Sequence, residues 1–173
     1  LGNCHPEIIE AVHQAHLRFG YHWEHPLRFE LAEKLGEIMP GQQLPRFTFE
    51  VSGTEAVESA VHMALCYTQR RHIISFTSSF HGEGLGTKMI SGYTSENNVY
   101  MEPWGGGVIK APYPYSQNIP ADMSPGQYVD YCLWYLETHI PSYITPADNI
   151  AAIIVEPGLA EGGNWIPSPD FIQ

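Results

Sequence analysis

Apolar side chains recur every three or four positions in two stretches of the first forty residues. The apolar positions are Ile8, Ile9, Val12 and Phe19 in the first stretch and Leu27, Leu31, Leu35 and Ile38 in the second. Because this spacing puts the apolar residues on one face of a helix, each stretch predicts an amphipathic helix. Pro6 suits the first turn of the first helix, and Pro40-Gly41 would end the second.

Three shorter segments have patterns that predict β-strands. Residues 47–51 alternate between apolar and polar side chains and are rich in strand-forming types, and residues 72–76 form a second such segment. Residues 151–155 are continuously apolar and stop at Glu156-Pro157, which is typical of a strand buried on both faces.

The segments between these strands complete the predicted architecture. Helical spacing of apolar residues follows Ser52, and a further helix is predicted from Pro125. Residues 104–127 are rich in Pro, Gly and Tyr and predict a long excursion over the surface. Strands that alternate with helices predict an α/β fold with a mainly parallel sheet flanked by helices.

Composition narrows the class of protein. Of the 173 residues 19 are acidic and 8 are basic, which gives a net charge of −11, and 43% are hydrophobic. This acidity argues against a nucleic-acid or anionic-membrane partner, because such a partner requires a basic patch. No run approaches the ~18 apolar residues of a membrane span. We therefore expect a soluble globular protein that binds neither nucleic acid nor membrane.

The cysteines and histidines bear on metal binding and on the cell compartment. Cys4, Cys66 and Cys132 lie about 65 residues apart, a spacing that fits neither a zinc site nor a redox pair. Their odd number suits a reducing compartment, so we predict a cytoplasmic protein. Some of the nine histidines have i, i+3 spacing, yet no cysteine or acidic pair completes a zinc signature. We predict no metal site.

The first candidate site is the junction Val51-Ser52-Gly53-Thr54-Glu55. Ser52 and Glu55 have the spacing of a capping box at the start of a helix. The first N–H groups of a helix lack intrahelical partners and lie at its positive end, Gly53 lets a ligand approach, and Thr54 adds a hydroxyl. These features predict an anion or phosphate site, with an ordinary capped helix as the alternative. Neither a Walker loop nor a dinucleotide-binding glycine pattern is present.

Two further candidates follow predicted strands. Phe80-His81-Gly82 comes just beyond residues 72–76, where ligands bind to parallel sheets, so Phe80 could stack on a planar ligand or else belong to the core. Glu156 at the end of a buried strand is costly unless a partner pairs with it. Glu161 could face a ligand or an arginine, or simply face water. Tyr21, Trp23 and Tyr93 are candidates for pocket walls.

Four motifs in register resemble those of the class III aminotransferases, which have the fold type I of pyridoxal-phosphate enzymes. Leu1-Gly2-Asn3-Cys4-His5-Pro6-Glu7 is similar to the family's "G-H-x-H-P", and Ser52-Gly53-Thr54-Glu55-Ala56 matches "S-G-[ST]-E-A". Phe80-His81-Gly82 matches "F-H-G". Residues 151–163 resemble "A-A-x-[IV]-x-E-P-x-x-x-E-G-G".

The resemblance implies a pyridoxal 5'-phosphate cofactor and a role for each candidate residue. Gly53 and Thr54 would bind the cofactor phosphate, Phe80 would stack on the pyridine ring, and His81 would lie beside it. Glu156 would lie near the end of the ring that bears the nitrogen and support a carboxylate that lies further along the family's chain. Glu161 aligns with a glutamate that pairs with a mobile arginine when the substrate changes. The resemblance further implies a homodimer, with residues 1–25 in an N-terminal small domain and residues 26–173 in the first part of the large, cofactor-binding domain.

The resemblance also implies that catalytic residues lie elsewhere. None of the lysines, Lys34, Lys88 and Lys110, lies in the family's Schiff-base motif, so we expect that lysine downstream and an inactive isolated segment. Both chain ends, at Leu1 and Gln173, suggest cuts through a longer protein. The expected activity is transfer of an amino group from an amino acid or ω-amine to an α-keto acid. The alternatives are an amino-acid racemase or epimerase of the same family and a non-catalytic domain that binds a phosphate ligand.

Overall fold

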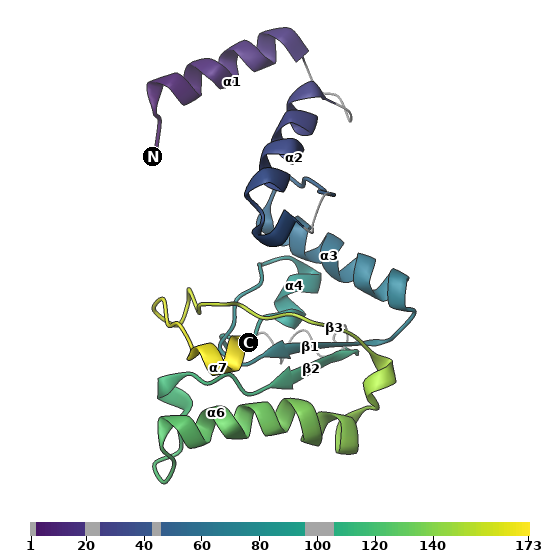
Figure 1. Ribbon diagram of the computed structural model, residues 1–173, viewed down its shortest axis with the longest axis vertical. Coiled ribbons are helices and arrows are strands. Elements are labelled where there is room, and N and C mark those ends of the chain that lie inside the picture. The colour runs from purple at the N-terminus through teal and green to yellow at the C-terminus, as the bar shows by residue number, and fades with distance from the viewer. Residues whose placement is uncertain (1–2, 20–24, 43–45, 96–105) are drawn as a thin grey trace. The chain divides into compact units, whose positions relative to one another are not determined.

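The computed structural model describes residues 3–19, 25–42, 46–95 and 106–173, and the chain divides into two compact units, Leu1–Phe49 and Glu50–Gln173. The first unit holds α1 (Pro6–Phe19) and α2 (Pro26–Ile38), which confirms both predicted helices (Figure 1). The His25 side chain caps α2 by accepting a hydrogen bond from the N–H of Leu27. A short 3-10 turn, Pro40–Gln42, follows, and Gly41 with a φ of 66° breaks the helical course there.

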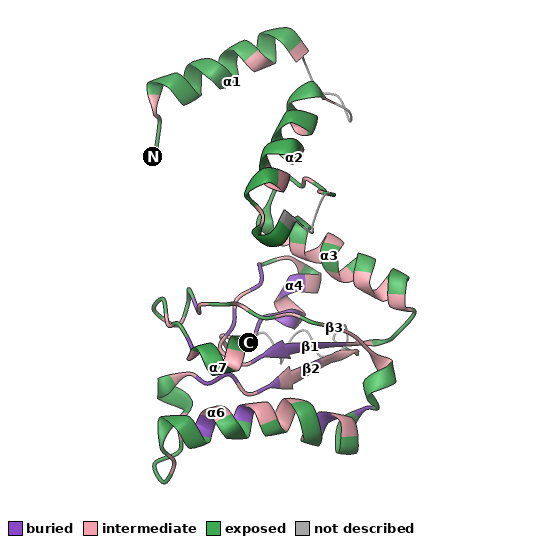
Figure 2. Cartoon of the chain, viewed as in Figure 1, coloured by how far each residue is buried: buried purple, intermediate pink, exposed green. Residues whose placement is uncertain are grey.

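The second unit is built on a parallel sheet of strand order β2-β1-β3, which confirms the predicted α/β class. The strands are β1 (His72–Phe76), β2 (Val108–Ala111) and β3 (Ile150–Ile153). Ile73 of β1 pairs with Val108 on one side and with Ala152 on the other. The central strand is buried from Ile73 to Phe76 (Figure 2).

Helices cover both faces of this sheet (Figure 1). On one face lie α3 (Gly53–Thr68) and α4 (Leu85–Ile90), and on the other lies α6 (Pro125–Trp134), which continues as a π-helix over Tyr135–Ile144. The other helical segments among the described residues are the 3-10 turns Ser116–Asn118 and Ala147–Asn149 and the C-terminal α7 (Pro169–Ile172). The predicted helix starts are confirmed at Gly53 and Pro125. No helix in the described ranges is long and apolar enough to cross a membrane.

The predicted strand over residues 47–51 is wrong. Residues 46–50 have no regular secondary structure and pair with no strand among the described residues. Their alternation has another cause, because Phe47 and Phe49 are half-buried within the first unit while their neighbours are exposed. The guanidinium of Arg28 in α2 lies 5.5 Å from the centre of the Phe49 ring. The alternation of apolar and polar residues therefore results from packing of the two phenylalanines near α2 and does not indicate a strand.

The prediction of a surface excursion over residues 104–127 is wrong for residues 108–115, whereas residues 116–127 are mostly exposed as predicted. This stretch contains β2, and Ala111 and Tyr113 within and just after the strand are completely buried. They join the core cluster of Ile74, Phe76, Ile109, Ala111, Tyr113, Ile140 and Leu159. A four-residue strand leaves little periodic signal, and the glycines and prolines around it suggested a loop.

The third correction concerns the strand predicted at residues 151–155. The strand is present as β3, but it lies at an edge of the described sheet and is not buried on both faces. Ile153 is 52% exposed and Val155 is 39% exposed. A continuous apolar run gives the hydrophobicity of a strand without saying which neighbours cover it.

Candidate functional site

At the N-terminus of α3, the N–H groups of Gly53 and Thr54 have no hydrogen-bond acceptor among the described residues. Ser52 caps the helix, because its hydroxyl accepts a hydrogen bond from the N–H of Glu55 at 3.2 Å. The Glu55 carboxylate accepts from the N–H of Val51 instead of Ser52, so the predicted capping box forms only in part. A methyl group built on Gly53 would meet no atom within 4 Å. A ligand can therefore approach the first turn of the helix, where N–H groups lack intrahelical acceptors.

Thr54 connects this helix to the glycine turn that follows β1. Its hydroxyl accepts a hydrogen bond from the N–H of Glu83 at 3.4 Å. A Cβ atom on Gly82 would lie 2.6 Å from the same hydroxyl oxygen, so the turn and the helix meet at close range. Because a hydroxyl has one hydrogen to donate as well as lone pairs to accept with, Thr54 keeps a donor for a ligand.

Glu156 fixes the position of Phe80 through the main chain. One carboxylate oxygen of Glu156 accepts from the N–H of Phe80 at 2.8 Å, and the other accepts from the N–H of Ala160 at 2.7 Å. The carboxylate therefore joins the turn after β1 to the loop after β3. The predicted partner for this partly buried acid consists of backbone N–H groups, which removes the cost of leaving the charge unpaired.

The Phe80 ring is half-buried beside another aromatic side chain. Its centre lies 5.6 Å from that of Tyr93, and the two planes are inclined at 57°. Tyr93 also donates a hydrogen bond to the Glu83 carboxylate, which forms an ion pair with Lys88 at 3.0 Å. Tyr93 thus lies beside Phe80, and its role as a pocket wall stays a prediction. Tyr21 and Trp23 fall outside the described residues.

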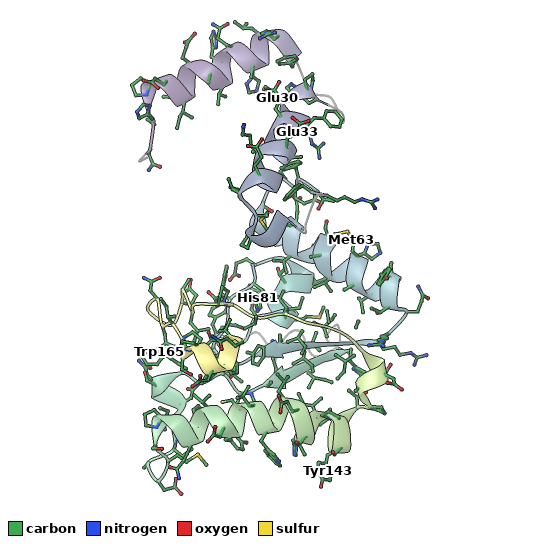
Figure 3. The ribbon with its side chains drawn as sticks, in the orientation of Figure 1. Glu30, Glu33, Met63, His81, Tyr143 and Trp165 are labelled. Atoms are coloured by element: carbon green, nitrogen blue, oxygen red, sulfur yellow. The ribbon has the colours of Figure 1, made fainter. Side chains whose placement is uncertain are left out.

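His81 is buried in the chain that connects β1 with α4 and is 8% exposed (Figure 3). The backbone N–H of His81 donates a hydrogen bond to the Ser91 hydroxyl at 2.8 Å. The ring atom Nε2 is buried without a hydrogen-bond partner among the described residues. Burial lowers the pKa of His81, the nearby Glu156 charge opposes this shift, and the Lys110 charge adds to it. The imidazole is therefore neutral near pH 7 and offers one buried nitrogen.

Glu161 occupies a different position from the other five predicted residues. It is exposed in the turn between Leu159 and Trp165, which form an isolated antiparallel bridge. Trp165, labelled in Figure 3, anchors this loop by donating from its indole N–H to the carbonyl of Pro114 at 3.1 Å. The structure thus brings Gly53, Thr54, Phe80, His81 and Glu156 onto connected segments and leaves Glu161 facing solvent.

Ser91 and Lys110 are residues of this region that the sequence did not single out. Ser91 is completely buried, and its hydroxyl donates to the carbonyl of Gly82 at 3.4 Å in addition to accepting from His81. Burial lowers the pKa of Lys110 to about 8. No pattern in the sequence identifies Lys110, because the four residues of β2 show no clear alternation of apolar and polar side chains.

The lowered pKa of His81 predicts acid sensitivity of the fold. Since the unfolded chain binds a proton near the ordinary value of 6.5 and the folded chain resists it, protonation favours unfolding as the pH falls below 6.5. We expect the thermal denaturation midpoint of the full-length protein to decrease when the pH is lowered from about 7.5 to 5.5. In His81→Gln this decrease should be smaller. His13→Gln on the exposed surface of α1 is the control. Equal pH slopes for wild type and His81→Gln would contradict this prediction.

Comparisons with known proteins place the chain in a family. The sequence model described as Aminotransferase class-III matches residues 1–173. A probable 4-aminobutyrate aminotransferase from Bacillus subtilis (strain 168) is 37% identical over 181 residues, which cover 100% of this chain and 40% of the relative. An alanine/serine racemase from Pyrococcus horikoshii is 29% identical over 182 residues, which cover 99% of this chain and 38% of the relative.

Solved structures agree with this assignment. An amine transaminase from an uncultivated Pseudomonas species, in its PLP-bound form, is similar with a TM-score of 0.83 at 27% identity, covering 98% of this chain and 40% of that one. The fold is therefore that of an α/β transaminase. The chain belongs to the aminotransferase class-III family. It spans about 40% of the length of the curated relatives quoted above.

Proposed function

We propose that this chain forms part of an aminotransferase that binds pyridoxal 5'-phosphate and transfers an amino group from an amino acid or ω-amine to an α-keto acid. The observation that carries the proposal is the junction of the open α3 N-terminus with the turn that holds Phe80 and His81. The family match, the 4-aminobutyrate aminotransferase relative and the PLP-bound neighbour support it.

The residues present fit the cofactor. Its phosphate suits the first turn of α3, where Gly53 leaves the approach open and Thr54 retains a hydroxyl donor. Its flat ring suits the half-buried face of Phe80. The buried Nε2 of His81, which lacks a partner among the described residues, fits a polar group of a ligand next to that ring.

When bound, pyridoxal phosphate supplies an electron sink for the carbon that loses a proton. In this proposal, the residues of this chain bind the cofactor and orient it. Backbone N–H groups of α3 hold the phosphate, and Phe80 supports the ring. In this assignment Glu156 supports the ring indirectly, because its two oxygens accept from the N–H groups of Phe80 and Ala160 and thereby keep Phe80 in place.

The lysine that would hold the cofactor covalently is assigned to sequence outside this chain. All three lysines here are engaged elsewhere: Lys34 pairs with Glu37, Lys88 pairs with Glu83, and Lys110 donates to Ser75 and to two backbone carbonyls. Glu161, exposed in its turn, is free to meet an arginine of the full-length protein, which is the substrate-switching role that the resemblance implies.

The experiment that tests this function uses the full-length protein. We expect an absorbance band at about 400 nm that borohydride abolishes, as for a cofactor held by a lysine, and amino transfer from 4-aminobutyrate or an α-amino acid to a keto acid. A protein that binds inorganic phosphate but shows no such band would support the alternative of a non-catalytic phosphate-ligand domain. Full turnover by residues 1–173 alone would contradict the assignment of the lysine to another part of the protein.

A racemase is the second candidate, favoured by the 29% identity to the alanine/serine racemase. Both activities begin with removal of a proton and differ in the carbon that receives it back. Incubation with one enantiomer of an amino acid and no keto acid separates them, because only a racemase forms the other enantiomer.

Three wider features belong to the same proposal. We assign residues 1–25 to an N-terminal small domain and residues 26–173 to the first part of the cofactor-binding domain. We also propose a homodimer in the cytoplasm, with small-molecule amino donors and keto acids as its substrates. Light scattering of the full-length protein tests the dimer, since a monomeric mass would exclude it.

A further inference from the structure

We propose that Lys110 is a positioning residue that holds, through Ser91, the turn on which Phe80 and His81 lie. The inference rests on the proposed function in one respect only, namely that this turn supports the cofactor ring. Among the described residues, Lys110 forms no hydrogen bond with the side chains of Phe80 and His81; its acceptors belong to Ser75, Ile90 and Ser91.

The ammonium group of Lys110 is bound on three sides. It donates to the Ser75 hydroxyl at 2.9 Å, to the carbonyl of Ser91 at 2.9 Å and to the carbonyl of Ile90. A lysine has three N–H donors, so each finds an acceptor here. Ile90 is the last residue of α4 and Ser91 follows it, so two of the bonds reach carbonyls that the end of a helix leaves without intrahelical partners.

Ser91 passes this restraint to the turn. Its hydroxyl accepts from the N–H of His81 at 2.8 Å and donates to the carbonyl of Gly82 at 3.4 Å. Ser91 is completely buried and Gly82 is buried as well, so neither group can exchange its partner for bulk water without a movement of the chain. A shift of the Ser91 main chain therefore shifts the main chain of His81 and Gly82.

The hydrogen bonds of Lys110 suit the positioning of this turn better than a general contribution to the stability of the fold. The side chain is partly buried, and no carboxylate among the described residues pairs with it, so its charge is held by neutral oxygens alone. An apolar side chain at this place on β2 would avoid the desolvation that lowers the pKa of Lys110 to about 8. What Lys110 adds in exchange is the set of directed bonds to the end of α4.

The first measurement needs no cofactor. In the full-length apo-protein, Lys110→Met should accelerate hydrogen exchange at the His81 amide about tenfold, because the Ser91 acceptor is no longer held in place. The control is Ile109→Val, which removes one methylene from a buried core residue next to Lys110 on the same strand. Unchanged exchange at His81 in Lys110→Met, or equal acceleration in Ile109→Val, would overturn the inference.

The second measurement concerns the cofactor. Lys110→Met should raise the Kd for pyridoxal 5'-phosphate about tenfold at a temperature where every variant is folded, whereas Ile109→Val should leave it unchanged. In a Ser91→Ala background Lys110→Met should have a smaller effect, because its path to the turn is already cut. Fully additive effects would reject the Ser91 path. If Lys110→Met does not fold, Lys110→Gln, which keeps one donor group, takes its place.

The two failures are distinguishable. A wild-type protein that binds no pyridoxal phosphate would refute the proposed function, and the exchange measurement would still decide whether Lys110 holds the turn. The inference about Lys110 would be refuted, and the proposed function retained, by a different result. In that case wild type binds the cofactor, and Lys110→Met shows the wild-type hydrogen exchange at the His81 amide and the wild-type Kd for pyridoxal phosphate.

Discussion

Replacing Gly82 with alanine is expected to lower the stability of the protein by about 2–5 kcal/mol, from backbone strain and overpacking together. Gly82 has a φ of +123°, which side-chain-bearing residues rarely adopt. The new Cβ would lie 2.6 Å from the Thr54 hydroxyl oxygen and 2.9 Å from that of Thr87. Both threonines are held by their own hydrogen bonds to the main chain of this region. Thermal or urea denaturation of the full-length protein measures the loss.

Gly53→Ala is the matched control for this prediction. A Cβ at Gly53 meets nothing within 4 Å, so its denaturation midpoint should stay close to that of wild type. The same methyl group would obstruct a phosphate at the start of α3, so cofactor affinity should fall while stability holds. A stability loss in Gly53→Ala as large as that in Gly82→Ala would contradict the prediction, because crowding and backbone strain could then not explain the effect at Gly82.

Removing the Glu156 side chain is expected to cost about 2–5 kcal/mol of stability and to weaken cofactor binding. Glu156→Ala leaves the N–H groups of Phe80 and Ala160 without acceptors and separates the turn after β1 from the loop after β3. Phe80 then loses the contact that fixes its main chain. Glu156→Gln retains one oxygen acceptor and should fall between wild type and alanine. Denaturation and a cofactor titration on the same samples measure both effects.

Glu161→Ala is the control for Glu156→Ala, because it removes a nearby carboxylate that does not hold the turn after β1. Glu161 lies in the following turn, is exposed, and carries the same charge. Its removal should change stability by no more than about 0.5 kcal/mol and leave cofactor affinity unaltered, although it should reduce activity toward one of the two substrates if it meets an arginine. Loss of stability in Glu161→Ala equal to that in Glu156→Ala would contradict the assignment of the two acids.

Local features of this chain could be predicted where a short segment contains its own signal. The helices at Pro6 and Pro125 each begin with proline and carry a regular apolar face, and the cap at Ser52 depends on a residue only three positions away. The need of Glu156 for a partner was also predictable, because a charge at the end of an apolar strand must be compensated.

Features that depend on distant segments could not be predicted. The partner of Glu156 is the N–H of Phe80, a backbone group that no side-chain pattern identifies. The strand β2 exists because Val108–Ala111 has β1 to pair with, and its four residues show no clear alternation. The segment at residues 47–51 has the alternation but no partner strand in the described ranges. The role of Lys110 could not be predicted for the same reason, since its acceptors belong to distant segments, one on β1 and two at the end of α4.

The bond between Glu156 and Phe80 also sets an order of events during synthesis. The two residues are 76 positions apart in the chain. At ribosomal rates of ~5–20 residues per second, the turn after β1 emerges about 4–15 s before the acid that holds it. During that interval the α3 N-terminus and the turn can form, but the N–H of Phe80 lacks the Glu156 carboxylate that holds it in place. The nascent protein should therefore gain its affinity for pyridoxal phosphate late, once β3 has been added to the sheet.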